Sequence, residues 1–180
     1  MVAFHTIIGK NKPRIYLAYD SRRKSNPNEE PFHIALFAVP KDPSSDGTCR
    51  RYHVMNTLEP TETGPPRQIW RFRSEDTDTN APPLAGLLFL GKLSRGKNLK
   101  ELEHTLVRVA INNDDPKWRC RHWALDAIQA LFREQIIKPL AQSPNDLWKT
   151  GKEYTLAHMS AANKEGLPVC DMHGNTYVLQ

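Results

Sequence analysis

The sequence has few cysteines, no long apolar run and only a weak bias of charge. Its three cysteines, Cys49, Cys120 and Cys170, are odd in number and too far apart for a disulfide framework. We therefore expect thiols in a reducing compartment and a cytoplasmic location. The longest apolar stretch, 84–90, is far shorter than the roughly 20 residues that cross a membrane, so no membrane partner is expected. The residues before Lys10 carry too few apolar side chains for a signal peptide.

The formal charge of +5 is spread along the chain. Short basic groups occur at Arg22–Lys24, Arg50–Arg51 and Arg119–Arg121. A protein that binds nucleic acid usually gathers its positive charge on one face or one helix. The pattern therefore disfavours nucleic acid and favours solvated surface charge. The expected partner is a small-molecule or peptide substrate.

The composition is that of a globular protein, with 39% hydrophobic and 25% charged residues. A chain of 180 residues suits a single domain over 1–180. We divide it into a strand-rich half (1–93), a helical half (94–165) and a tail (166–180). The expected strands are Arg14–Tyr19, Phe32–Val39, Thr48–Asn56, Gln68–Arg73 and Leu84–Leu93. Because loops rather than helices join them, they favour an antiparallel meander of about five strands over a doubly wound parallel sheet.

After Leu93 the apolar residues recur at helical spacing. A first helix is expected within 99–110. A second opens at Asp114 and Asp115, which suit a helix N-cap, and runs on unbroken through WRCRHWALDAIQALFREQII. A third begins near Ser143. About three helices over one face of the sheet give an α+β fold.

Cys120 is the first candidate for chemistry. It lies in the opening turns of the second expected helix, where the helix dipole stabilises a thiolate. Arg119 and Arg121 would lower the pKa of the thiol further. Such a thiolate is a nucleophile if a histidine exchanges its proton. The alternative is a small buried side chain, a common role for cysteine.

His33 interrupts an otherwise apolar strand, so its imidazole needs a polar partner. If the chain turns around residues 40–47, His53 on the next strand falls nearly opposite, within a residue of register. Cross-strand neighbours lie about 5 Å apart, close enough for a base and the group that orients it. With Cys120 the two histidines form a Cys–His–His constellation.

The segments RIYLA, FHIALFAVPK, RRYHVMNT and DDPKWRCRHW together resemble an uncharacterised domain family common in fungi, over most of the chain. More distantly, the order strand-His, strand-His, helix-Cys resembles the circularly permuted papain-like fold of lecithin:retinol acyltransferase-type enzymes and permuted deubiquitinase-like peptidases. RCRHW is similar to the N-C-E-H-F segment of those acyltransferases. The resemblance implies Cys120 as nucleophile, His33 as general base and acid, and His53 as the orienting residue. Arg119 stands where the acyltransferases have Asn, and no apolar anchor follows, which disfavours membrane lipid as the substrate.

These residues predict a thiol-dependent acyl-transfer enzyme: a hydrolase, acyltransferase or cyclase acting on an amide, ester or thioester of a small molecule or peptide. Two alternatives stay open, a non-catalytic binding module and an acid–base isomerase or cyclase that uses the same pocket. A catalytic pair requires the Cys120 sulfur within about 4 Å of a His33 ring nitrogen. No cofactor is expected. Cys49 with His53, and Cys170 with His173, are isolated pairs rather than the four ligands of a structural zinc site, so no metal ligands are assigned.

Overall fold

The computed structural model describes residues 12–22, 30–40, 49–79, 83–159 and 166–177. Residues 1–11, and most of the turn expected at 40–47, lie outside the described residues. In chain order the elements are β1 (Arg14–Ser21), β2 (Phe32–Val39), β3 (Cys49–Glu59), β4 (Arg67–Thr77), β5 (Leu84–Lys92), α1 (Leu99–Val107), α2 (Cys120–Arg133), α3 (Pro144–His158) and β6 (Val169–Cys170). Within the described ranges, no helix is long and apolar enough to cross a membrane.

The strands form one sheet in the order β4-β3-β2-β1-β5-β6. Among the described residues the α+β class and the three helices are confirmed, but the sheet is mixed and has six strands rather than forming a five-stranded meander. β5 returns to pair antiparallel with β1, and β6 adds to β5 in parallel. Burial explains this order. The centre of β5 is apolar on both faces and needs cover on both sides, whereas β4 is largely exposed and tolerates the edge.

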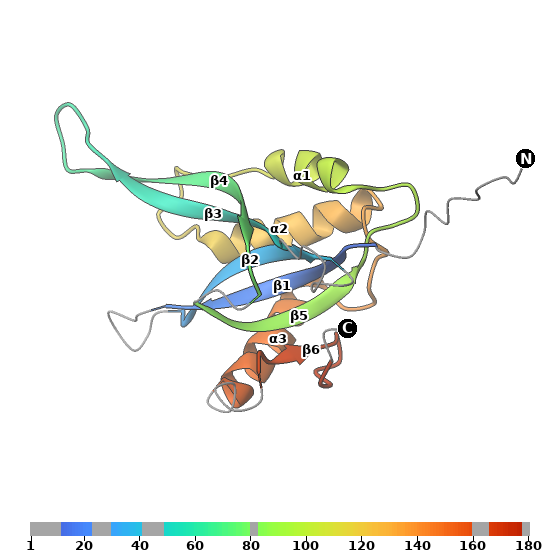
Figure 1. The fold of residues 1–180 in the computed structure, drawn as a ribbon. Helices are drawn as coiled ribbons and strands as arrows, with labels where there is room; N and C mark the ends of the chain where they lie inside the picture. The colour runs from blue at the N-terminus through green and yellow to red at the C-terminus, as the bar shows by residue number, and fades with distance from the viewer. Residues whose placement is uncertain (1–11, 23–29, 41–48, 80–82, 160–165, 178–180) are drawn as a thin grey trace, which may run out of the picture.

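Strand alternation divides the sheet into two faces. Phe32, Ile34 and Leu36 of β2 belong to the larger core, together with buried side chains of all three helices. Ala35 and Phe37 belong to a smaller core on the opposite face. The helices therefore cover one face of the sheet, as Figure 1 shows for α1 and α2 beside β1 to β3.

The hairpin of β3 and β4 projects beyond the rest of the sheet (Figure 1). β3 pairs with β2 only from Leu36 opposite Tyr52 to Ala38 opposite Arg50, and then diverges from it. The first half of β2 is left without β3 on that side. The start of α2 packs at this gap, where Cys120 receives a hydrogen bond from the backbone N–H of Ile34.

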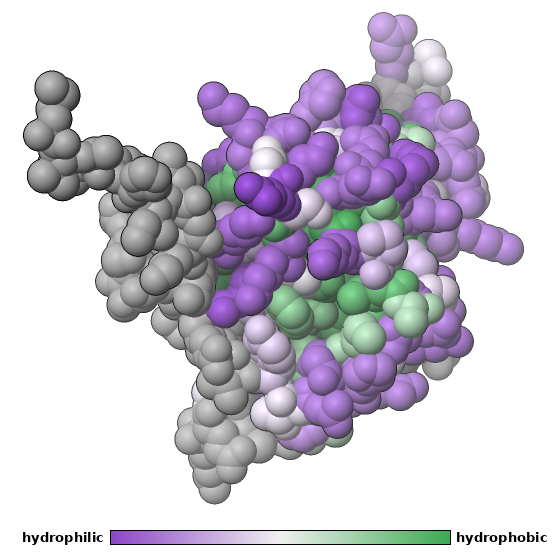
Figure 2. All heavy atoms as spheres, turned by 90° about the vertical axis from the view of Figure 1, so that its right-hand side faces the viewer, coloured by the Kyte–Doolittle hydropathy of each residue, from purple (hydrophilic) through white to green (hydrophobic). Residues whose placement is uncertain are grey.

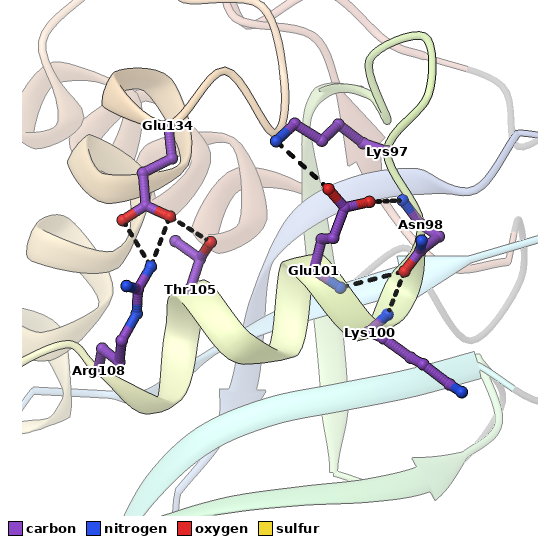
Figure 3. A network of polar contacts seen from close by, with 7 residues as sticks. All are labelled: Lys97, Asn98, Lys100, Glu101, Thr105, Arg108 and Glu134. Atoms are coloured by element: carbon purple, nitrogen blue, oxygen red, sulfur yellow. Dashed lines mark hydrogen bonds and ion pairs between the residues drawn. The ribbon is translucent and has the colours of Figure 1, made fainter.

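Both ends of α1 are held by side-chain hydrogen bonds (Figure 3). At its start Asn98 accepts from two backbone N–H groups of the first turn, and the Glu101 side chain accepts from the Asn98 N–H at 3.1 Å. This reciprocal arrangement is a capping box. Near the helix end Thr105 and Arg108 donate to Glu134, at 2.7 and 2.8 Å. Glu134 directly follows α2, so these bonds fix the end of α2 against α1.

The helix expected to open at Asp115 starts later. The side chain and carbonyl of Asp115 close a turn over the next residues, and Arg119 is extended, with φ −146° and ψ 166°. The helix begins at Cys120, which is therefore its first residue. It ends at Arg133 rather than running on, because Gln135 adopts a left-handed backbone conformation with φ 54°.

Candidate functional site

A cavity of about 790 Å³ opens where α2 begins. The β3–β4 hairpin contributes Trp70 to its wall, β2 contributes Phe32, and the end of β1 contributes Arg22. Cys120 is the one cysteine among the described residues that line it. The divergence of β3 from β2 makes this space, so the fold places the thiol at the inner wall of a ligand-sized cavity.

Three donors surround the Cys120 sulfur. Arg22 Nη2 lies 3.5 Å from Sγ, and the backbone N–H groups of Ile34 and Arg121 also donate to it. Burial nevertheless raises the pKa of the Cys120 thiol above its ordinary value, although the donors and the Arg22 charge act in the opposite direction. The expected lowering of this pKa is therefore wrong for the unliganded protein, and the thiol is neutral at pH 7.

The arginines on either side of Cys120 do not supply its cation. Arg119 donates to the carbonyl oxygens of Pro116 and Trp118, both at 2.6 Å. The guanidinium of Arg121 lies 4.6 Å from the ring centre of Trp148. The positive charge beside the sulfur comes instead from Arg22 at the end of β1.

The two candidate histidines are in direct contact. His33 Nε2 lies 2.9 Å from His53 Nδ1, with the rings edge to face. At the other side of His33, Nδ1 lies 3.0 Å from Arg22 Nη2. Beyond His53, Nε2 lies 3.3 Å from a carboxylate oxygen of Glu75. A chain of polar contacts therefore runs from Cys120 through Arg22, His33 and His53 to Glu75, and its last contact is not a hydrogen bond.

The donors and acceptors of this chain fix the positions of its protons. A guanidinium can only donate, so His33 Nδ1 must accept from Arg22 and carry no proton. The proton of neutral His33 is then on Nε2, which donates to His53 Nδ1. His53 in turn carries its proton on Nε2, which lies 3.3 Å from a Glu75 carboxylate oxygen but outside hydrogen-bond geometry. Both imidazoles are neutral, and a proton taken up at His33 Nδ1 would be stabilised by the acceptors behind it.

The register of the two histidines differs from the expected one. Continued beyond its last pair, the β2–β3 register would place His53 opposite Ala35, two residues from His33. The histidines are diagonal rather than direct neighbours. Long side chains reach across a diagonal on the same face, which explains the contact between the ring nitrogens.

A buried ion pair lies next to the histidines. Asp20 is 1% exposed and accepts from Arg51 Nη2, and Arg51 Nη1 lies 3.5 Å from Glu75. Burial raises the pKa of the Asp20 carboxyl to about 6, an effect that the Arg51 charge limits. Arg51 thus links the carboxylate that faces His53 to a second, buried one.

Residues 12–166 match a sequence family described as a family of unknown function, DUF6914. The chain belongs to the DUF6914 family. No curated protein and no solved structure matches it. The matched DUF6914 segment contains the whole polar chain from Arg22 to Cys120, so this site is part of the family domain.

In the DUF6914 domain His33 and His53 are in contact, but the predicted direct contact between a His33 ring nitrogen and the Cys120 sulfur is not among the hydrogen bonds of the described residues. Arg22 lies between the two instead. Arg22 contacts both Sγ of Cys120 and Nδ1 of His33, so these atoms are no further apart than the sum of the two contact distances. By alternation His33 lies on the face of β2 opposite the helices, whereas Cys120 packs in the core beneath them. The His33 ring and the Cys120 sulfur can therefore approach each other only around the edge of β2 that β3 leaves unpaired. At that edge the Arg22 guanidinium contacts both groups.

Sequence reasoning missed four residues of the DUF6914 site. They are Asp20, Arg22, Arg51 and Glu75. Asp20 could have been noticed in the sequence, because an acidic residue directly follows the apolar run of the first expected strand. Glu75 carried no such signal, because it lies beyond the expected strand Gln68–Arg73, whereas β4 runs on to Thr77. Arg22 carried none, since it was one member of a dispersed basic group.

No group of three or more His, Cys, Asp or Glu side chains could hold a metal ion in the described ranges. A second cavity of about 770 Å³ lies at the far end of β5, with Phe89, Leu93 and Leu140 in its wall. Figure 2 looks at this side of the DUF6914 domain and shows apolar surface ringed by hydrophilic side chains. The described lining includes one histidine, His173, and no cysteine, so the cavity at Cys120 is the better site for chemistry.

Burial and neighbouring positive charges lower the pKa of His33 to about 3 and that of His53 to about 4. Between about pH 6.5 and 4 the unfolded chain therefore binds protons at these residues that the folded domain does not. Their contribution to stability is full above pH 6.5 and is lost as the pH falls. We expect the free energy of unfolding to drop by about 1–2 kcal/mol per histidine between pH 7 and 5. Asp20 takes up a proton over the same range and partly offsets the drop.

Urea denaturation of the wild type and of the double variant H33N/H53N at pH 7, 6 and 5 measures this effect. Asp20 is present in both proteins, so the difference between their slopes isolates the histidine pair. H104N, at an exposed histidine of α1, is the matched control and should keep the wild-type slope. A double variant with the wild-type slope would mean that the pair is not held neutral in the fold.

Proposed function

We propose that this DUF6914 domain is a thiol-dependent acyl-transfer enzyme with Cys120 as nucleophile. The observation that carries the proposal is the polar chain Cys120–Arg22–His33–His53–Glu75 at the wall of a ligand-sized cavity. A cysteine and a histidine backed by a further orienting group form the usual arrangement of an activated nucleophile.

In the proposed reaction Sγ of Cys120 attacks the carbonyl carbon of an amide, ester or thioester while His33 Nδ1 takes the thiol proton. The new S–C bond leaves the former carbonyl oxygen as an oxyanion. The oxyanion collapses, the bond to the leaving group breaks, and His33 returns the proton to that group. Water or a second nucleophile then releases the acyl group, which gives hydrolysis, transfer or cyclisation. His53 positions His33 by accepting its Nε2–H throughout.

Arg22 must move before this proton transfer. Its Nη2 occupies the acceptor site of His33 Nδ1, and the same guanidinium contacts the sulfur. Arg22 is an exposed side chain in the cavity wall, so it can turn toward a ligand. In the unliganded domain the thiol stays neutral and protected, in line with its raised pKa.

The permuted papain-like arrangement, an occurrence common in fungi and a cytoplasmic location remain parts of this proposal. Two histidines that meet from neighbouring strands, beside a helix that starts with cysteine, support the papain-like reading. Three buried thiols are compatible with a reducing compartment.

A non-catalytic binding module is the second candidate. The observation that favours it is that burial raises the pKa of Cys120 while Arg22, rather than the sulfur, bonds to His33. In that case the same cavity binds a ligand and Cys120 forms part of its wall.

Alkylation of the native protein by iodoacetamide at pH 8 separates the two candidates. We expect Cys120 to react first, because it lines the cavity while burial raises the pKa of Cys49 to about 11 and of Cys170 to about 12. Peptide mass spectrometry identifies the modified residue, and C120S is the control. Preferential labelling of Cys49 or Cys170, with Cys120 silent until urea unfolds the protein, would favour the binding module.

A further inference from the structure

The cavity at Cys120 is strongly cationic. Arg22, Lys117, Arg119 and Arg121 line it, and among the described residues the lining contains one acidic residue, Glu30. We propose that it binds the carboxylate or phosphate group of a small acyl compound. The claim that this acyl compound is the substrate rests on the function proposed above. Its binding to the cavity can be measured without any reaction.

The four cations are not neutralised by neighbouring carboxylates. Elsewhere on the domain arginine and lysine side chains commonly pair with Asp or Glu, as Arg50 does with Asp76 and Arg108 with Glu134. Within the described ranges, none of the four cavity cations forms an ion pair. Unpaired positive charge that converges on one concave surface attracts an anion and raises its local concentration.

Glu30, the acidic residue in the described part of the wall, does not cancel this charge. Glu30 lies 2.8 Å from Lys152 Nζ, and the Lys152 ammonium also lies 5.0 Å from the ring centre of Trp148. Glu30 is thus already compensated from outside the group of four. The net charge presented to a ligand is positive.

Two cations are well placed to meet the ligand directly. Arg121 is half-buried and held against Trp148, so little side-chain freedom is lost when it binds. Lys117 is exposed, and no side-chain partner holds it among the described residues. Both line the same cavity as Cys120, so the anionic group would bind in the cavity that holds the thiol.

The other residues of the cavity wall indicate what the uncharged part of the ligand is like. Trp70, which is 6% exposed, supplies aromatic surface, and the amides of Asn56 and Gln68 supply polar contacts. A volume of about 790 Å³ accommodates a molecule with a flat or apolar body attached to its anionic group. An anion in the cavity would also draw Arg22 toward itself and release His33 Nδ1, so binding the correct substrate would prepare the thiol for reaction.

Isothermal titration calorimetry with phenyl phosphate and benzyl alcohol tests this proposal. The two probes share the aromatic ring and differ in charge. We expect phenyl phosphate to bind at least about tenfold more tightly than benzyl alcohol, and its affinity to fall as NaCl is raised. The variant K117Q/R121Q should lose about tenfold or more in affinity for phenyl phosphate. R95Q, which removes an exposed arginine from the second cavity, should bind as the wild type does.

Equal affinity for the two probes in the wild type would overturn the proposal, and this comparison needs no variant to fold. Unchanged affinity in K117Q/R121Q would overturn the assignment to this cavity. C120S separates this proposal from the proposed function, because it retains the cations and should bind phenyl phosphate normally. If anions bind but Cys120 never reacts, the anion site stands and the acyl-transfer function falls. If Cys120 is acylated but charge does not affect binding, the reverse holds.

Discussion

Replacing Arg51 by methionine is expected to lower the free energy of unfolding by about 3 kcal/mol at pH 8. The change removes the cation that bonds to Asp20 and leaves a carboxylate that is 1% exposed without its partner. It also removes the 3.5 Å contact with Glu75 that helps to hold this carboxylate beside His53. Breaking a buried pair from one side costs more than the pair contributes, because the remaining charge stays desolvated.

The loss should shrink as the pH falls. Burial already raises the pKa of Asp20 to about 6, and losing Arg51 raises this pKa further. The folded variant therefore takes up a proton on Asp20 that the unfolded chain, with an ordinary pKa near 3.9, does not. Urea denaturation at pH 8 and pH 5 measures the difference from wild type. D20N/R51M removes the stranded charge and should recover part of the loss, and a double variant no more stable than R51M would contradict this account.

Replacing His33 by alanine is expected to lower the hydrolysis of 4-nitrophenyl acetate about 100-fold, since general acid–base catalysis contributes at least that factor. This neutral ester does not need the anion site in order to bind, and it reacts in those molecules whose Arg22 has turned away from His33 Nδ1. The loss should appear in the release of nitrophenolate at pH 7. H104A, at an exposed histidine, is the matched control and should retain the wild-type rate.

His53 should behave as a positioning residue. H53N keeps an acceptor for the Nε2–H of His33, and H53A does not. H53N should therefore lose less activity than H53A, a difference that simple loss of packing would not give. Denaturation midpoints of both variants show whether either change acts through stability. Equal loss in H53N and H53A at equal stability would remove His53 from the proton route.

Residue alternation and helical spacing predicted most of the fold, because they record which side chains face the core. The apolar runs of β1, β2 and β5, and the Ser143-Pro144 start of α3, are local signals. The place of β5 beside β1 is not local, and neither is a parallel pairing as short as Val169–Cys170. The start of α2 was missed for a tertiary reason. Trp118 is buried edge to face against Trp70, and the chain stays extended at Arg119 after it.

The sequence predicts those members of the candidate site whose residue type is unusual for their place in a strand or helix. A histidine in an apolar strand and a cysteine near a helix start are visible in any sequence. The link between Cys120 and Arg22 joins residues 98 positions apart, and no periodicity encodes such a contact. The direction of the Cys120 pKa was also beyond reach, because it depends on how deeply the fold buries the sulfur.

The measurement that tests the nucleophile most directly is the location of the acyl group during hydrolysis of 4-nitrophenyl acetate. The wild-type reaction is quenched with acid while nitrophenolate is still being released, and the protein is digested and mapped by mass spectrometry. The proposed function predicts an acetyl thioester on Cys120 in the wild type, formed more slowly in H33A and absent in C120S. Acetyl groups found only on lysines, with hydrolysis unchanged in H33A and C120S, would contradict it.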